Sequence, residues 1–379
     1  MNMKPNGKSR ITMKKTGAIV MAMLLLSGAA DAQISAPGHA TDFGSMSTED
    51  LIGKLQYESS QGIGTHATAW ASGFMAIDDE PQFRGGIMGS AKPLVSPVMR
   101  ELVRRGTAAL PLLIEHLSDS RPTKLTVGDG FMGKWFDKEY DPKDRSQGAP
   151  PASSMLQQKR FDRYTVKTGD LCFVAIGQIV NRLLNAVRYQ PSMCLVVNSP
   201  VEMPSLAAAV KADWSGLTRA AHERSLEQDA LSTSDPFLSP EALKRLVFYY
   251  PDAGIPLAVR LLDRPFTQPR VDFFTPHRLI DALSCFPSPV IDQGVYNLLK
   301  RAVESHPANI NDKFERCELA YACAKRLTRP DERNSLSHSY QEMMKSRVPH
   351  GDATPKAIAA FDLHFDKFLK DLLAKLAPT

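Results

Sequence analysis

Two distant segments of the sequence repeat the same pattern of apolar residues and prolines. The first, GTAALPLLIEHLSD, occupies 106–119, and the second, PDAGIPLAVRLLD, occupies 251–263. The first segment places four apolar residues at i, i+3, i+4 and i+7, namely Leu110, Leu113, Ile114 and Leu117. Because this spacing aligns them on one face of a helix, the segment predicts an amphipathic helix.

A second helix is predicted directly before this segment, over SPVMRELVRRG at 96–106. Ser96 suits the N-cap, and Pro97 suits the first helical position, where a missing N–H costs nothing. Gly106 can end the helix in a left-handed conformation. A very short turn then joins the two helices into an antiparallel pair.

The same order of signals returns at 239–265, in SPEALKRLVFYYPDAGIPLAVRLLDRP. Superposing the two copies places Pro111, in the first turn of its helix, on Pro256. Further segments with helical periodicity are 169–189, 202–212, 215–230, 276–285, 289–305, 311–327, 331–346 and 355–376. No strand-rich region of any length lies among them, so we predict an all-α fold.

The helix pair at 96–119 resembles a HEAT-like (armadillo-type) helical repeat of the short bacterial kind, whose second helix carries an Ala-x-Pro-x-Leu pattern like AALPLLIEHL. The resemblance implies an irregular α-solenoid of antiparallel helix pairs over 93–379, and the helix pattern by itself points to the same architecture. The two clear copies lie 145 positions apart, counted from Pro111 to Pro256, whereas such repeats recur about every 30 to 47 residues. The units between the copies must therefore be degenerate or interrupted.

Residues 1–32 have the features of a Sec-type signal peptide. Two lysines precede the apolar run AIVMAMLLL at 18–26, and Ala30-Asp31-Ala32 forms a cleavage site after Ala32. This run is too short for a membrane-spanning helix, which needs about 20 residues. We therefore expect a periplasmic or secreted protein with no transmembrane anchor after cleavage. The block GDLCFVAIGQIVNRLLNAVRYQP, at 169–191, is similar to one in uncharacterised exported bacterial proteins, a resemblance that implies no function.

The mature chain is nearly neutral. Residues 1–32 carry five of the 46 basic and one of the 41 acidic side chains, which leaves 41 basic and 40 acidic side chains and a net charge of +1. Nucleic-acid binding needs a concentrated basic surface, so no nucleic-acid partner is expected. The expected partner is a protein or cell-envelope material, and the oligomeric state stays open.

Five cysteines remain after cleavage: Cys172, Cys194, Cys285, Cys317 and Cys323. An oxidising compartment permits disulfides, and Cys172–Cys194 is the favoured pair. Buried free thiols are the alternative. The odd count leaves at least one cysteine unpaired.

The segment 33–92 is expected to form a flexible or irregular N-terminal arm that precedes the helical domain. Within it, STEDLIGKLQYES at 47–59 predicts one helix. Ser47 and Asp50, three residues apart, are typical of a helix N-terminus.

An insertion at 123–165 interrupts the helical pattern with turn glycines and aromatic residues. KLTVGDGFMGKWF, at 124–136, predicts a small β-hairpin, and RFDRYTV, at 160–166, predicts a further strand. A loop of this length is usually functional or disordered. The sequence leaves open a binding insertion, a structural flap over the apolar face of the solenoid, and a disordered segment.

No motif implies a cofactor or a metal. GDGFMGK, at 128–134, matches the start of a phosphate-binding loop, but Trp135 stands where a Ser or Thr would bind Mg²⁺, and no helical pattern follows. DKEYDPKD, at 137–144, alternates acidic residues as Ca²⁺ loops do, but Pro142 replaces the turn glycine. The sequence also contains no HExxH, G-x-S-x-G or S-x-x-K motif, so no catalytic residue is assigned.

Six residues are candidates for ligand binding: Trp135, Tyr140, Asp170, Asn181, Arg182 and Arg188. The first two are aromatics of the insertion, and the other four belong to the predicted helix at 169–189. Residues 171–177 are apolar nearly all round, which predicts a buried central helix. Beyond them, polar residues are expected along one face, with Arg188 at the helix end. This face is either a solvated stripe with Asp170 as a cap, or a surface that hydrogen-bonds an acidic or glycan ligand.

Three classes of function remain. The favoured class is an exported binding or scaffold protein of the bacterial cell envelope, which uses a helical-repeat surface for protein or cell-wall contacts and needs no chemistry. The second class is an envelope hydrolase with a dispersed site near residues 170–222. It would gather four residues around a deep pocket, namely Asp170, Arg182, Asp213 and His222. The third class is a self-assembling structural protein.

Overall fold

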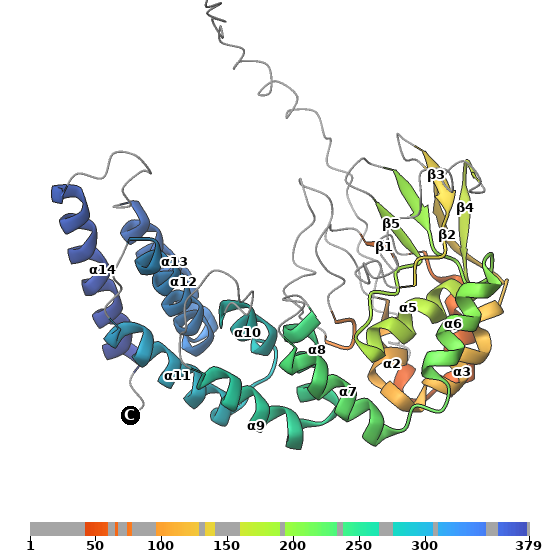
Figure 1. Cartoon of the computed structure of the whole chain (residues 1–379), viewed down its shortest axis with the longest axis horizontal. Coiled ribbons are helices and arrows are strands. Elements are labelled where there is room, and N and C mark those ends of the chain that lie inside the picture. The colour runs from red at the N-terminus through yellow and green to blue at the C-terminus, as the bar shows by residue number, and fades with distance from the viewer. Residues whose placement is uncertain are drawn as a thin grey trace, which may run out of the picture. The chain divides into compact units, whose positions relative to one another are not determined.

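The computed structural model is mostly helical. It describes residues 42–59, 65–66, 74–77, 96–128, 133–140, 160–189, 194–232, 238–264, 276–305, 310–345 and 355–376. Of the confidently placed residues, 69% are helical, and the described part of the chain contains 13 α-helices with a few small strands (Figure 1). The described residues from Phe43 onward belong to one unit, Phe43–Thr379. The predicted signal peptide and its cleavage site lie outside the described residues.

The first group of helices surrounds one buried helix, α5. Its members are α1 (Thr48–Lys54), α2 (Pro97–Arg104), α3 (Leu110–Glu115), α5 (Thr168–Val180) and α6 (Pro204–Trp214). Every residue of α5 is buried, and α1, α2 and α3 pack against it. The prediction of a buried central helix over 171–177 is confirmed, because a helix enclosed on all sides needs apolar residues on every face.

The N-terminal arm is not irregular throughout. Ser47 caps α1, since its hydroxyl accepts a hydrogen bond from the Asp50 amide at 3.1 Å. Within the arm, Leu51, Ile52 and Phe74 are fully buried and belong to the same core as α5. The expectation of a flexible or irregular arm over 33–92 is therefore wrong for these residues, because their apolar side chains gain free energy by burial.

The signals predicted for the first helix pair are confirmed. The Ser96 hydroxyl accepts hydrogen bonds from the amides of Val98 and Met99, each at 3.2 Å, and Pro97 is the first residue of α2. Gly106 has a φ of +57°, and a Cβ added there would lie 2.9 Å from the Tyr249 ring. Only glycine fits both this backbone conformation and this close approach.

The strands form two small sheets within the described residues. β1 (Thr65–His66), β5 (Val187–Tyr189), β6 (Leu195–Val197) and β3 (Lys134–Phe136) make one sheet in that order, and β2 (Pro122–Val127) pairs antiparallel with β4 (Tyr164–Lys167). The predicted hairpin at 124–136 is wrong, since β2 and β3 lie in different sheets. The strand predicted at 160–166 is found in part, as β4, which begins at Tyr164 and ends at Lys167. An all-α description is thus only roughly correct.

The described strands of the insertion belong to the packed structure. Leu125 of β2, Phe136 of β3 and Tyr164 of β4 are nearly fully buried and join the first core. The ring of Phe136 lies 5.2 Å from that of Tyr164 at an edge-to-face angle. These strands therefore form part of the core, while 141–159 lie outside the described residues.

The predicted helix over 169–189 is wrong in its second half. The helix α5 ends at Val180, and Asn181 adopts a left-handed conformation with a φ of 57°. The Arg182 amide then donates to the Gly177 carbonyl at 3.0 Å, the i→i−5 bond of a Schellman-type C-cap. A Cβ on Gly177 would lie 2.6 Å from that of Leu184, so the chain folds back closely over this glycine.

The second group of helices packs mostly in chain order (Figure 1). Its members are α7 (Arg219–Leu231), α8 (Leu238–Tyr249), α9 (Pro251–Leu262), α10 (Pro276–Leu283), α11 (Pro289–Glu304), α12 (Ile310–Leu327), α13 (Arg333–Lys345) and α14 (Pro355–Leu376). Helix α7 packs on α8, α8 on α9, α9 on α11, and α11 on α12. Helix α10 contacts both α8 and α12, and α14 contacts α11, α12 and α13. All the segments predicted from 202 onward are found as helices, with ends shifted by a few residues.

The second copy of the helix pair departs from the first. Pro251 begins α9, and Pro256 lies inside it instead of in its first turn. The superposition of Pro256 on Pro111 therefore predicted the wrong start for α9, which begins five residues before Pro256. The proline at 251 already satisfies the preference for proline at the first helical position.

The buried apolar residues form two clusters joined at α8. The first is built by residues between Leu51 and Val210, and the second by residues between Leu226 and Leu372. Phe74 belongs to the first cluster, and its ring lies 5.2 Å from that of Phe248 on α8. The Arg245 guanidinium, also on α8, lies 4.6 Å from the centre of the same ring and donates to the Gln178 carbonyl at 2.6 Å. These contacts join α8 to α5 and to the N-terminal arm.

The five cysteines are free thiols. Cys172, Cys317 and Cys323 are buried, which raises the pKa of each thiol. The favoured disulfide, Cys172–Cys194, is therefore not formed, and the alternative of buried thiols holds for these three residues.

Candidate functional site

Asp170 lies inside the protein and is not available to a ligand. It is fully buried at the start of α5, where it accepts hydrogen bonds from the hydroxyls of Tyr164 and Ser199, each at 2.5 Å. It also accepts one from the Lys167 amide at 2.8 Å. Burial raises the pKa of Asp170 to about 6, although these hydrogen bonds oppose the shift. Asp170 thus joins β4, α5 and the segment after β6.

Three of the predicted ligand-binding residues come together around Trp214, the last residue of α6. The Arg182 guanidinium lies 5.7 Å from the centre of the Trp214 ring and forms an ion pair with Asp229. The Asn181 amide donates to Asp229 at 3.2 Å, and the indole N–H of Trp214 donates to the Tyr140 hydroxyl at 2.5 Å. The expected polar helix face is absent here, because Asn181 and Arg182 follow the end of α5. Their polar groups hold α7 and the insertion against α5.

The two remaining candidates lie on the four-stranded sheet. Arg188 is on β5, not at a helix end, and its guanidinium forms a two-point ion pair with Glu139. Trp135 is half-buried on β3, and its indole N–H is buried without a hydrogen-bond partner among the described residues. The four charged or amide candidates therefore all have partners inside the fold.

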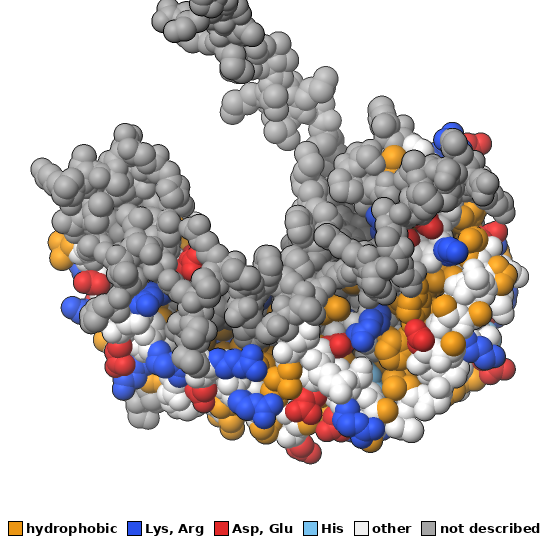
Figure 2. Space-filling model, viewed as in Figure 1, with side chains coloured by type: hydrophobic (Ala, Val, Ile, Leu, Met, Phe, Trp, Pro, Cys, Tyr) orange, Lys and Arg blue, Asp and Glu red, His pale blue; other side chains and the backbone are white. Residues whose placement is uncertain are grey.

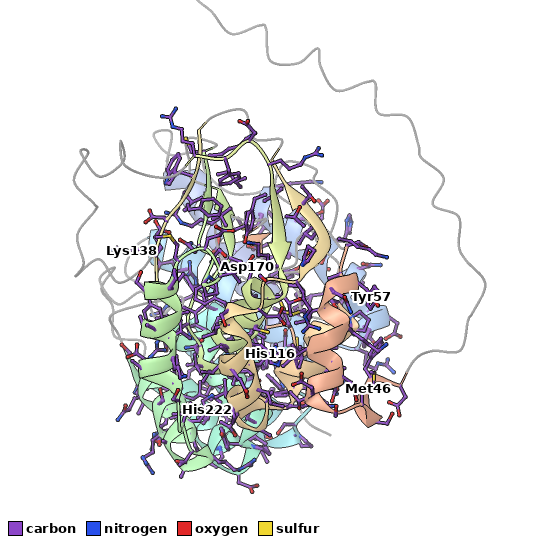
Figure 3. The ribbon with its side chains drawn as sticks, turned by 90° about the vertical axis from the view of Figure 1, so that its right-hand side faces the viewer. Met46, Tyr57, His116, Lys138, Asp170 and His222 are labelled. Atoms are coloured by element: carbon purple, nitrogen blue, oxygen red, sulfur yellow. The ribbon has the colours of Figure 1, made fainter. Side chains whose placement is uncertain are left out.

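The four residues of the proposed hydrolase site do not meet around one pocket. The Tyr140 hydroxyl is hydrogen-bonded to Asp213 and lies near Arg182, but Asp170 and His222 lie elsewhere. His222 is buried on α7, with Nδ1 2.9 Å from the Tyr250 hydroxyl and Nε2 3.0 Å from the Ile179 carbonyl. Burial lowers the pKa of His222 to about 4, so its imidazole is neutral. Figure 3 shows Asp170 and His222 well apart. Among the described residues, no hydrogen bond or ion pair joins Asp170, Arg182 and His222 to one another.

A cavity of about 520 Å³ lies where α8, α10, α12 and α13 meet the N-terminal arm. We call it the basic cleft, because four of its lining residues are basic: Arg104, Lys325, Arg326 and Arg333. Apolar side chains line it as well, among them Ile77, Phe248, Ile280 and Phe286. Asp281 of α10 and Ser284, the residue after this helix, also line it. Its volume lies in the range typical of ligand sites.

The four basic residues of the cleft fall into two kinds. Arg326 is a structural residue, since its side chain is 5% exposed, pairs with Asp292 and donates to the Phe286 carbonyl at 2.9 Å. Burial lowers its pKa, which the neighbouring Asp292 carboxylate opposes. Arg104 and Lys325 are exposed and Arg333 is half-buried, and none of these three forms an ion pair with another described residue. Their charges are available to a ligand.

A second, more open cavity of about 620 Å³ lies beside α9. It is lined by four apolar and three charged residues, namely Ile255, Pro256, Val259, the exposed Val290, Arg260, Asp263 and Arg264. Figure 2 shows basic and acidic side chains interspersed on the face around α9 and α11. Arg301 pairs there with Asp263 at 3.2 Å, for example. This face therefore carries no unbalanced charge comparable with that of the basic cleft.

Sequence reasoning missed the basic cleft because no local signal marks it. Its lining comes from separate parts of the chain, which include the arm, α2, α8, α10, α12 and α13. Lys325 and Arg326 end a predicted helix, where basic residues are common because they favour the helix dipole. Only the packing of α10 between α8 and α12 brings these residues to one cavity.

The described residues contain no group of three or more His, Cys, Asp and Glu side chains placed to hold a metal ion. Within the same residues, no helix is both long and apolar enough to cross a membrane. A comparison of the chain with protein-family models, with curated proteins and with solved structures found no match. The candidate site thus depends on the geometry of this protein alone.

Proposed function

We propose that this protein is an exported binding or scaffold protein of the bacterial cell envelope, and that the basic cleft contacts an acidic part of its partner. The observation that carries the proposal is the set of three accessible basic side chains, Arg104, Lys325 and Arg333, in one partly apolar cavity. Complementary charge of this kind steers a partner and selects it. Binding of this kind requires no catalytic group.

The order of helix packing supports a HEAT-like solenoid for the second half of the chain. From α7 to α12, most helices pack on neighbours close in sequence, which is the arrangement of stacked repeats. Stacked helix pairs leave one surface continuous over several repeats, and the basic cleft opens between three of the helices, α8, α10 and α12. Export is supported by the predicted Sec-type signal peptide, with cleavage after Ala32.

The proposal can be tested by affinity capture from envelope extract. The bait is the mature chain, beginning at Gln33, and the cleft variant carries Arg104→Glu, Lys325→Glu and Arg333→Glu. A control variant carries the same number of charge reversals at three exposed lysines outside the cleft, Lys211, Lys300 and Lys370. Circular dichroism first verifies that all three baits are helical.

We expect the native bait and the control to retain the same partner, and the cleft variant to lose it. The retained partner should dissociate at high salt, because exposed charges are screened there. Equal retention by the cleft variant would refute the role of the cleft. If the native bait retains no envelope component, the binding function itself is wrong.

A further inference from the structure

We infer that the basic cleft binds an extended peptide segment with acidic residues on both sides of a short apolar centre. This inference depends on the proposed binding function and specifies the chemical class of the partner. It follows from where the basic, apolar and acceptor groups lie along the cleft.

The basic groups enter the cleft from two sides. Arg104 is the last residue of α2, in the helix group built around α5, and lines the cleft with Ile77 and Phe248. Lys325 and Arg333 come from the end of α12 and the start of α13. Because α10 packs between α8 and α12, these two sources lie on either side of it. A ligand with two separate negative charges could pair with both sources.

The centre of the cleft is apolar. Ile280 of α10 is 2% exposed, and Ala322 of α12 is half-buried. Phe248 and Phe286, both partly buried, line the same cavity. Burial of one or two apolar side chains of a ligand against these residues would add about 25 cal/mol for each Å² removed from water. A ligand that is anionic along its whole length would not use this surface.

The α10 side of the cleft carries a hydrogen-bond acceptor. Asp281 lines this side of the cleft, and the Ser284 hydroxyl donates to the Asp281 backbone carbonyl at 2.7 Å. The Ser284 hydroxyl oxygen can accept a hydrogen bond from a backbone N–H of an extended peptide. A phosphate has no apolar group to place against Phe248, Ile280 and Phe286, which favours a peptide over a phosphate or a nucleic acid.

A membrane surface fits the cleft less well than a peptide does. Among the described residues, the exposed large hydrophobic side chains are Tyr57, Val290 and Leu363, and none of them lines the cleft. Binding at a membrane interface requires an exposed apolar face beside the basic residues. The apolar residues of the cleft are at least partly buried, and a peptide side chain can reach them.

The test measures the affinity of a fluorescein-labelled peptide by anisotropy, with the mature protein. The peptide has Glu-Glu at each end and Leu-Phe in the middle. One control peptide replaces every Glu with Gln, and a second replaces Leu-Phe with Gly-Gly. Inorganic phosphate and vesicles with an anionic lipid serve as competitors, and the charge-reversal variants of the capture experiment serve as protein controls.

We expect each peptide control to bind at least tenfold more weakly than the parent peptide. Reversing Arg104 alone should weaken binding of the peptide that has Glu at both ends. Of two further peptides, each with Glu at only one end, the reversal should weaken one and have no effect on the other. The Lys211, Lys300 and Lys370 reversals should leave all affinities unchanged. A parent peptide that binds the cleft variant as well as the native protein would overturn the inference.

The outcomes separate this inference from the proposed function. Suppose that the cleft variant loses the envelope partner while, on the native protein, phosphate or anionic vesicles displace that partner and the peptide does not. In that case the proposed function stands and the peptide is the wrong class of ligand. If neither peptide nor partner depends on Arg104, Lys325 and Arg333, the peptide inference and the role of the cleft are both wrong.

Discussion

Asp170 should make the stability of the first core depend on pH in a way that a single substitution removes. Its pKa is raised from 3.8 to about 6 in the folded protein, chiefly because burial penalises the charged carboxylate. The unfolded chain therefore loses this proton at a lower pH than the folded protein does. The contribution of Asp170 to stability is fully present below pH 3.8 and is lost as the pH rises through about 6.

The size of the effect follows from the two pKa values. A shift of about two units corresponds to roughly 3 kcal/mol, of which about 2 kcal/mol falls between pH 4 and pH 7. The Asp170→Asn variant cannot titrate at this position. The free energy of unfolding of the wild type minus that of the variant should therefore decrease by about 2 kcal/mol from pH 4 to pH 7. Taking this difference removes the contribution of Glu58 and Asp137, whose pKa values burial also raises.

The assay is urea unfolding at several pH values, followed by tryptophan fluorescence. Of the three tryptophans, Trp214 packs against the core that contains Asp170, and Trp135 lies next to Phe136 of that core, so the emission of both reports on its unfolding; Trp70 lies outside the described residues. The Ser199→Ala variant is an informative companion, because it removes a hydrogen bond that lowers the pKa of Asp170. It should shift the titration to higher pH. A difference curve that stays flat from pH 4 to pH 7 would refute the reasoning.

Three further predictions concern backbone fit, an anchoring side chain and thiol access. Gly106→Ala should lower the free energy of unfolding by about 1–3 kcal/mol, because a φ of +57° strains an L-residue. Gly53→Ala is the control: its added Cβ would have no heavy atom within 4 Å, so it should be neutral or stabilising in the same denaturation assay. Arg105→Lys should speed proteolytic cleavage of the segment that precedes α1, because the Arg105 guanidinium donates to three backbone carbonyls of that segment. An unchanged cleavage rate would contradict this anchoring. In the native protein only Cys194 and Cys285 should react with a thiol reagent, because the other three thiols are buried. The number of thiols that react is compared with the number in the denatured chain, where all five are accessible.

Local signals in the sequence determined most of the helices of this protein. Ser96 and Pro97 start α2, and Ser47 starts α1, because an N-cap hydroxyl satisfies amides only a few residues away. Apolar periodicity likewise identified the helices from α6 to α14, since each needs one buried stripe whatever its neighbour is. Such features depend on residues within one or two helical turns, so the sequence contains all the information they need.

The tertiary structure decided where the chain turns and which residues meet. The helix α5 stops at Val180 because the chain can fold back over Gly177 against Leu184, a contact that no periodicity reveals. β3 pairs with β6, about 60 residues later, instead of with the adjacent strand β2, because strand pairing is selected by the packing of both faces and not by proximity in sequence.

The candidate site shows the same division. The polar residues singled out by the sequence, such as Arg182 and Arg188, became partners of Asp229 and Glu139 inside the fold. A charged residue in a sequence carries no mark of whether a counter-ion will lie beside it. The basic cleft instead combines side chains from separate helices, and its available charge exists only because α10 holds those helices at this spacing.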